Sequence, residues 1–170
     1  MALTIENGTV VDGADSYATV EATQAFAAAR GLELPATDTE VEQLLITAKD
    51  YLEGLRAEYQ GTKTAKENPL QWPRADVVID GFTVEEDEIP AELVAAQMRL
   101  ACYAYENGGT LTATSDGRVV VEERVEGAVD TKYADHGDNS PQPQFPEADA
   151  LIKPLLRASV FGGAGIAIRV

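Results

Sequence analysis

The feature that most constrains this chain is a run of apolar residues at helical spacing in its first third. They recur every three or four positions, at Val41, Leu44, Leu45, Ala48, Leu52 and Leu55. This spacing places one apolar stripe on an α-helix and leaves the opposite face in water. Thr37 and Glu40 precede it with the spacing of a capping box, in which both side chains bond to the backbone. We therefore predict a capped helix over residues 38–57 that must bury its stripe against other elements.

Helical signals also occur on both sides of this segment. Thr19 is placed to cap a helix N-terminus, an Ala-rich stretch follows, and Gly31 stands where a left-handed C-cap belongs. This pattern predicts a helix over residues 20–30. Apolar residues at helical spacing predict another helix over residues 147–157. Pro154 lies inside that helix and should kink it or leave it with a short first turn.

A third helix is expected behind Ile89-Pro90, since proline is favoured at the first helical position. Residues 93–105 are apolar or small at most positions. A helix that is apolar on nearly all sides is buried on nearly all sides. A chain of 170 residues has few other elements to surround it. We therefore expect its own fold to cover part of this helix and another subunit to cover the rest.

Three stretches are typical of extended or hairpin structure. Val77-Val78-Ile79 and Phe82-Thr83-Val84 flank the turn dipeptide Asp80-Gly81, which predicts a small hairpin. Residues 118–133 alternate with a period of two and predict a second hairpin. Residues 3–11 surround Asn7-Gly8 and are interpreted as a short extended or hairpin segment.

Together these patterns predict a mainly α fold, a small helical bundle of about four helices with a β-hairpin and an extended C-terminal arm. We assign residues 1–160 to the helical domain, with a linker at 135–145, and residues 161–170 to a flexible docking arm. Between residues 58 and 89 the helical pattern breaks. Trp72 is expected to anchor this long loop in the core.

Charge and rare residues limit the chemistry. The 13 Lys and Arg against 29 Asp and Glu give a net charge of −16, which disfavours binding of the whole chain to nucleic acid phosphates or anionic lipid. The single Cys cannot form an internal disulfide, and a single His removes most triads and zinc sites. The first residues do not resemble a signal peptide, and no apolar run approaches the length of about 20 residues needed to cross a bilayer. We expect a soluble protein that is not an enzyme and binds no cofactor or metal.

Four features could carry chemistry, and each has a simpler structural explanation. The acidic residues 85–88 lack the ligand order of a calcium loop and are interpreted as a solvated run before a helix. His136 lies in a polar linker that holds no converging partners. Cys102 is expected to be a small buried hydrophobe. Trp72 beside Arg74 could stack a nucleic acid base, but cations are scarce there, so a core role is favoured.

The order of several motifs resembles one known family. In chain order they are Asp15-Ser16-Tyr17-Ala18-Thr19-Val20-Glu21, Ala48-x-x-Tyr51-Leu52, Trp72-Pro73-Arg74, Ile89-Pro90, Glu122-Glu123-Arg124-Val125-x-Gly127-x-Val129-x-x-x-Tyr133, Phe145-Pro146 and Leu151-Ile152-x-Pro154-Leu155-Leu156. The chain resembles, over nearly its full length, the head–tail connector (adaptor) proteins of tailed bacteriophages. The branch it resembles is often labelled DnaT-like single-stranded DNA-binding protein.

This resemblance implies a structural virion protein of the phage neck that assembles in the host cytoplasm. Its copies would form a ring, expected to be a dodecamer, between the portal protein and a stopper or tail protein. DNA would pass through without specific binding, which the acidic composition favours because like charge removes the gain from counterion release. No membrane contact is expected.

Two sets of residues are candidates for contacts in such a ring. The Gly-rich hinge and apolar tip of the arm suit docking as an added strand or plug. The docking residues expected on the portal are Phe161, Ile166, Ile168 and Val170. The hairpin residues expected to contact a neighbouring subunit or the tail are Val119, Val121, Val129 and Tyr133.

Single-stranded DNA binding is the alternative function. It requires a cationic groove and exposed aromatic side chains. The chain has six Tyr, four Phe and one Trp, but its 13 cations are spread among 29 acids. The sequence therefore favours the structural ring over DNA binding, and it shows no set of residues for an enzyme.

Overall fold

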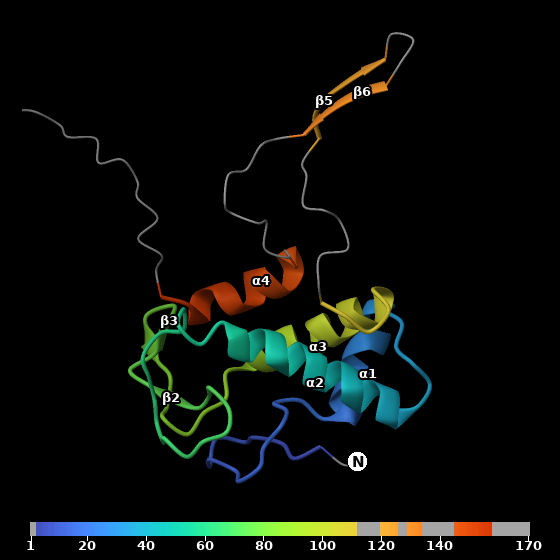
Figure 1. The fold of residues 1–170 in the computed structure, drawn as a ribbon. Helices are drawn as coiled ribbons and strands as arrows, with labels where there is room; N and C mark the ends of the chain where they lie inside the picture. The colour runs from blue at the N-terminus through green and yellow to red at the C-terminus, as the bar shows by residue number, and fades with distance from the viewer. Residues whose placement is uncertain (1–2, 112–119, 126–128, 134–144, 158–170) are drawn as a thin grey trace, which may run out of the picture.

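The computed structural model describes residues 3–111, 120–125, 129–133 and 145–157, the two middle segments by their backbone alone. It confirms a mainly α fold (Figure 1). Its helices are α1 (Val20–Arg30), α2 (Asp38–Gly54), α3 (Ala91–Glu106) and α4 (Pro146–Ile152), and a 3₁₀ turn, η1 (Lys153–Leu155), follows α4. The strands form antiparallel pairs: β1 (Thr62–Lys63) with β2 (Arg74–Ala75), β3 (Val78–Ile79) with β4 (Phe82–Thr83), and β5 (Val120–Val125) with β6 (Val129–Tyr133).

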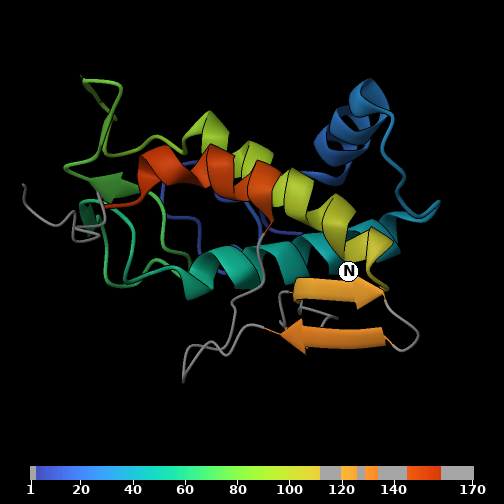
Figure 2. The same cartoon turned by 90° about the horizontal axis from the view of Figure 1, so that it is seen from above.

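The core lies around α3, which packs against α1, α2 and α4 of the same chain (Figure 2). Leu93, Ala96, Leu100 and Ala101 are fully buried there. We expected another subunit to supply part of this cover, but most of it comes from the chain's own helices. Tyr105, at the end of α3, remains 39% exposed.

The expected boundaries of α1 are confirmed by its caps. The hydroxyl of Thr19 accepts a hydrogen bond from the backbone N–H of Ala22. Gly31 adopts a left-handed conformation (φ +65°), and its N–H donates to the carbonyl oxygens at the end of the helix. A residue with a side chain is strained in this conformation, which explains the glycine.

The predicted start of α2 is right, but its capping box and its end are wrong. The hydroxyl of Thr37 donates to the carboxylate of Glu40 instead of capping the backbone. The helix ends at Gly54 instead of residue 57, because tight turns follow it and bring Tyr59 back into the core. There the hydroxyl of Tyr59 donates to the carbonyl oxygen of Leu52, at 3.0 Å.

The N-terminal segment is not a hairpin. Ile5 forms an isolated parallel bridge with Ser16. The buried carboxylate of Glu6 accepts hydrogen bonds from the backbone N–H groups of Gly8, Val10 and Val11. These N–H groups are therefore satisfied by a side chain, and no second strand is needed to pair with them.

The other expected elements are present, with small shifts. The β3–β4 hairpin forms around Asp80 and Gly81, which both have positive φ. The β5 and β6 strands pair as predicted, with an irregular register between Val120 and Glu122. Residues 126–128, most of the linker and the whole arm at 161–170 lie outside the described residues.

The helix expected over residues 147–157 is shorter than predicted: α4 ends at Ile152, and Pro154 lies in the 3₁₀ turn η1 that follows it, because a proline has no N–H to continue the α-helical hydrogen bonds. The chain then pairs with the segment that follows α2. Leu156 forms an antiparallel bridge with Tyr59. The N–H of Gln60 donates to Leu155, and the N–H of Arg157 donates to Glu58, at 2.9 and 2.7 Å.

Candidate functional site

A buried polar network joins the N-terminal segment to α2 and α3. The side chain of Gln97, fully buried on α3, accepts from the N–H of Tyr17 at 2.8 Å. Its amide nitrogen donates to the hydroxyl of Ser16 at 2.9 Å and also to a backbone carbonyl of α2. All its main hydrogen-bonding groups are therefore used inside the fold.

A second network surrounds Trp72, which is fully buried as predicted. The hydroxyl of Tyr17 donates to the carboxylate of Glu53 at 2.6 Å and accepts from the N–H of Trp72 at 3.3 Å. The rings of Tyr59 and Trp72 meet edge to face, with their centroids 5.7 Å apart. Burial, reinforced by the charge of Glu53, raises the pKa of Tyr17 well above its ordinary value. The raised pKa keeps the phenol of Tyr17 protonated. The hydrogen bonds of this phenol anchor the long loop that contains Trp72.

Arg74 is a buried cation whose hydrogen bonds go to the backbone. Its guanidinium donates to the carbonyl oxygens of Gln60, Gly61 and Gln71 at 2.6, 2.9 and 3.3 Å. Burial, followed by the charge of Arg157, lowers its pKa. The sequence indicated a core role for Trp72. It did not indicate that Arg74 is also buried and that its guanidinium joins residues 60–61 to Gln71.

Several clefts lie on the described surface, and two of them border α4. One, of about 430 Å³, opens between α1, α3 and α4. Its lining residues are Phe26, Arg30, Leu32, Ala95, Arg99, Glu147 and Leu151, and we call it the arginine cleft. The other, of about 930 Å³, lies between α2 and α4 beside Tyr51 and Asp149. Burial and the neighbouring Asp149 raise the pKa of Tyr51 to about 12, so this second cleft carries acidic groups and a neutral phenol.

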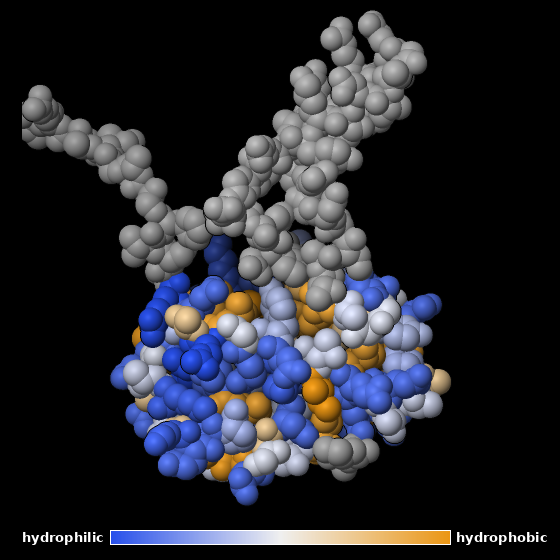
Figure 3. All heavy atoms as spheres, in the orientation of Figure 1, coloured by the Kyte–Doolittle hydropathy of each residue, from blue (hydrophilic) through white to orange (hydrophobic). Residues whose placement is uncertain are grey.

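Among the described residues, the most exposed large apolar side chain lies on the β3–β4 hairpin. Phe82 is 78% exposed and Val78 is 47% exposed. Residues 85–88, which follow this hairpin, are acidic and exposed as predicted. The face shown in Figure 3 is mainly hydrophilic with separate apolar patches.

The described cations and aromatic side chains are mostly engaged inside the chain. The cations that donate to backbone carbonyl oxygens are Arg30, Lys63, Arg74 and Arg157. Lys49 pairs with Asp50, and Arg99 pairs with Glu147. The buried aromatic residues are Tyr17, Phe26, Tyr59, Trp72 and Phe145. Most of the described cations are therefore already bonded to groups of the chain itself, and the arginine cleft is the place where two of them lie beside an aromatic ring.

The predicted contact residues lie outside the described side chains. Phe161, Ile166, Ile168, Val170 and Val119 fall in segments that the structure does not describe. Val121, Val129 and Tyr133 lie on β5 and β6, which are described by their backbone. Their proposed contacts stay predictions.

The remaining candidates are placed as follows. Cys102 is buried as predicted, and burial raises the pKa of its thiol. His136 lies outside the described residues. Among the residues that are described, no group of three or more His, Cys, Asp or Glu is arranged to hold a metal ion.

Sequence reasoning missed the buried polar residues Glu6 and Gln97. It also missed that Arg30 and Arg99 line the same cleft. Nothing in the local pattern separates Gln97 from a solvated glutamine. Its one signal is its position in an otherwise apolar helix, where a polar residue requires partners.

The fold and its two polar networks define a small, mainly α protein whose long central loop is fixed to the helical core. Within the described residues, no helix is both long and apolar enough to span a membrane. The chain belongs to the family described as "Putative DnaT-like ssDNA binding protein", whose model matches residues 1–170. This membership confirms the expected resemblance to DnaT-like proteins. The comparisons found no similar curated protein and no similar solved structure.

Proposed function

We propose that this protein is a structural subunit of the neck of a tailed phage, where copies form a connector ring between the portal and a stopper or tail protein. The observation that carries the proposal is the strongly acidic composition of the chain, together with the bonding of most of its described cations inside the fold. The chain has a net charge of −16, and most described cations are bonded to its own backbone or acids. Such a surface lets DNA pass without the counterion release that holds it.

The motif order supports the same proposal. Asp15-Ser16-Tyr17 and Trp72-Pro73-Arg74, which contribute to the resemblance to connectors, both lie in the buried networks that fix the loops. Their place in the core explains why a connector fold would need these residues. The contacts with other proteins are assigned to the β5–β6 hairpin and to the arm at residues 161–170.

Deletion of residues 161–170 tests the docking part of the proposal. We expect the shortened chain to keep its circular dichroism spectrum and melting temperature but to lose attachment to DNA-filled heads that carry the portal. A second variant keeps the length of the chain and replaces Phe161, Ile166, Ile168 and Val170 by Ser. It should also fail to attach, because the apolar side chains carry the docking. Attachment of the deleted chain would show that the arm is not the docking element.

The family description favours a second function, binding of single-stranded DNA. Fluorescence anisotropy with a labelled oligonucleotide at low salt separates the two. The structural proposal predicts no binding at micromolar protein. Sub-micromolar binding that weakens steeply with salt would support the DNA-binding function instead.

A further inference from the structure

The arginine cleft holds two guanidinium groups on a strongly acidic chain. The guanidinium of Arg30 lies 3.6 Å from the centroid of the Phe26 ring, and one of its nitrogens donates to the Phe26 carbonyl oxygen at 3.2 Å. Arg99 lies 4.8 Å from the centroid of Tyr103 and pairs with Glu147. The apolar lining residues are Phe26, Leu32, Ala95 and Leu151.

One donor in this cleft lacks an acceptor. The Nε atom of Arg99 is buried and has no hydrogen-bond partner among the described residues. A buried donor without a partner is costly, and native structures rarely keep one. Among the residues that the structure describes, Arg30 forms no ion pair of the kind that joins Arg99 to Glu147. The cleft is therefore suited to a ligand that combines an apolar group with carboxylates.

The chain itself presents such a group on the β3–β4 hairpin. Phe82 is 78% exposed beside Val78, and the acidic residues 85–88 follow it. The hairpin is held in place, since the N–H of Val84 donates to Val77 at 2.9 Å and the side chain of Gln60 donates to Val78 at 3.3 Å. A preorganised hairpin loses little entropy on binding.

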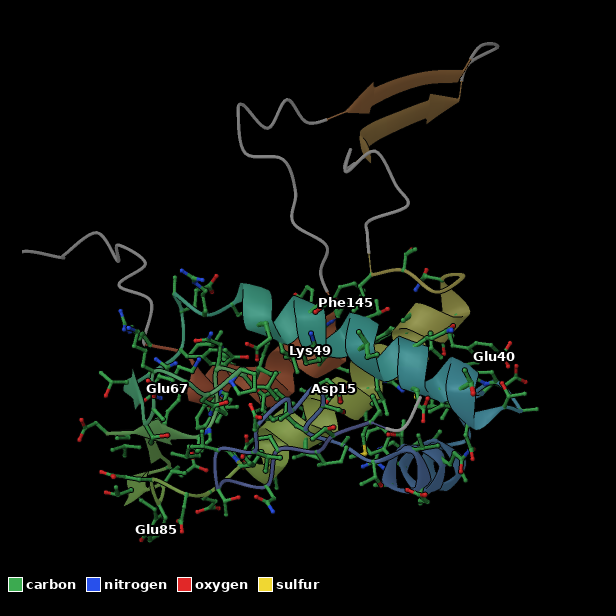
Figure 4. All side chains as sticks on the ribbon, turned by 60° about the horizontal axis from the view of Figure 1, so that its bottom comes forward. Asp15, Glu40, Lys49, Glu67, Glu85 and Phe145 are labelled. Atoms are coloured by element: carbon green, nitrogen blue, oxygen red, sulfur yellow. The ribbon has the colours of Figure 1, made fainter. Side chains whose placement is uncertain are left out.

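The hairpin and the cleft lie apart on the molecule. β3 lies at the left of Figure 1, and α1, which carries Arg30, lies at the right. Figure 4 shows Glu85, in the acidic run, at the end opposite α1. Two complementary surfaces at different ends of one chain form a head-to-tail contact, which closes into a ring when its rotation allows.

We propose that Phe82 of one copy inserts into the arginine cleft of the next copy, with its acidic residues 85–88 facing Arg30 and Arg99. This inference rests on the proposed self-assembly and names the contact that performs it. Phe82 would be the central apolar anchor, and the charges would fix the register around it. The negative net charge of the chain opposes contacts between two acidic surfaces, so a contact that places acidic residues against two arginines is favoured over them.

Two variants of the full chain test the contact, because each one destroys only one of its two surfaces. Phe82→Asp keeps the cleft, and Arg30→Glu keeps the hairpin. Sedimentation velocity should show wild-type oligomers and mainly monomers for each variant, with association weakened on the order of 30-fold. An equal mixture of the two variants should form a dimer and nothing larger, since the dimer joins the one intact cleft to the one intact hairpin.

Matched controls carry the same changes elsewhere. Tyr105→Asp alters another exposed aromatic of the described residues, and Arg56→Glu reverses an exposed cation after α2. Both should keep the wild-type oligomers. If Arg30→Glu disturbs folding, Arg30→Gln gives the same test with the charge removed. A charge swap is a further test: Glu86→Arg should restore association when it is combined with Arg30→Glu.

Three results would overturn the contact: oligomers that survive Phe82→Asp, a mixture that contains no dimer, or a wild-type chain that stays monomeric at the highest soluble concentration. Failure of the proposed neck function is seen separately. If purified particles lack the protein while the mixing result holds, the contact stands and the neck role is wrong.

Discussion

The side-chain amide of Gln97 on α3 donates to the backbone carbonyl oxygen of Leu45 on α2, at 2.9 Å. This bond lies in the middle of the core, where both residues are fully buried. A carbonyl oxygen in the middle of a helix already accepts from its own helix, so the glutamine uses its second lone pair. The relationship fixes the register of α2 against α3 by a polar contact instead of by packing alone.

Replacing Gln97 by Leu should therefore be costly although it keeps a similar volume. The N–H of Tyr17 loses its acceptor, and we expect the free energy of unfolding to fall by about 2–4 kcal/mol. Urea unfolding followed by circular dichroism measures the loss. Gln43→Leu, on the exposed face of α2, is the control and should change stability little. An equal loss in both variants would contradict the role given to Gln97.

Gly8 should tolerate no side chain. It has φ +102°, and a Cβ there would overlap the carbonyl oxygen of Asp87. We expect Gly8→Ala to lower stability by about 2 kcal/mol or more, since backbone strain adds to the overlap. Gly13 has φ +69° but open space around its Cβ position, so Gly13→Ala should cost about 1 kcal/mol from strain alone. Thermal melts compare the two, and a reversed order would show that the approach to Asp87 is not tight.

Alkaline pH should unfold the protein through its buried phenols. Burial raises the pKa of Tyr51 to about 12, and burial also raises the pKa of Tyr17 and of Tyr59. Unfolded tyrosines ionise near pH 10 while the folded ones stay protonated, so the unfolded state loses protons first and stability falls as pH rises above about 10. Tyr51→Phe should make this fall shallower in urea titrations at several pH values. Tyr105→Phe removes a phenol at a more exposed site and is the control.

Cys102 should react slowly with thiol reagents in the folded protein. Burial raises the pKa of its thiol, so less of the reactive thiolate is present at neutral pH, and access is blocked as well. Alkylation followed by mass spectrometry should be at least tenfold slower than in urea, where the thiol is exposed. Fast labelling of the native protein would contradict its placement in the core.

The helices could be predicted because their signals are local. Thr19 and Gly31 mark both ends of α1, and the apolar stripe of α2 follows one period. Pro154 also acts through its own geometry, so a disturbance of the last helix was expected, although its continuation as the 3₁₀ turn η1 was not. The end of α2 was predicted wrongly because Tyr59 returns to the core, and that contact depends on residues far along the chain.

The polar core and the clefts could not be predicted in the same way. Glu6 and Arg74 resemble surface residues in the sequence, yet each is buried by bonds to backbone groups of a loop. Arg30 and Arg99 belong to different helices, and their shared cleft exists only once α1, α3 and α4 have packed. Contacts of this kind arise from tertiary structure, which short-range patterns do not encode.

The pairing of Leu156 with Tyr59 has a mechanical consequence. Arg157, the last described residue, is bonded through its N–H to Glu58 and through its side chain to the carbonyl oxygen of Tyr59. Tension applied to the chain beyond this point is passed directly to Tyr59 and the adjoining Trp72, and it bypasses the short α4. A subunit held by its C-terminal segment would thus bear a load at two fully buried residues of its core.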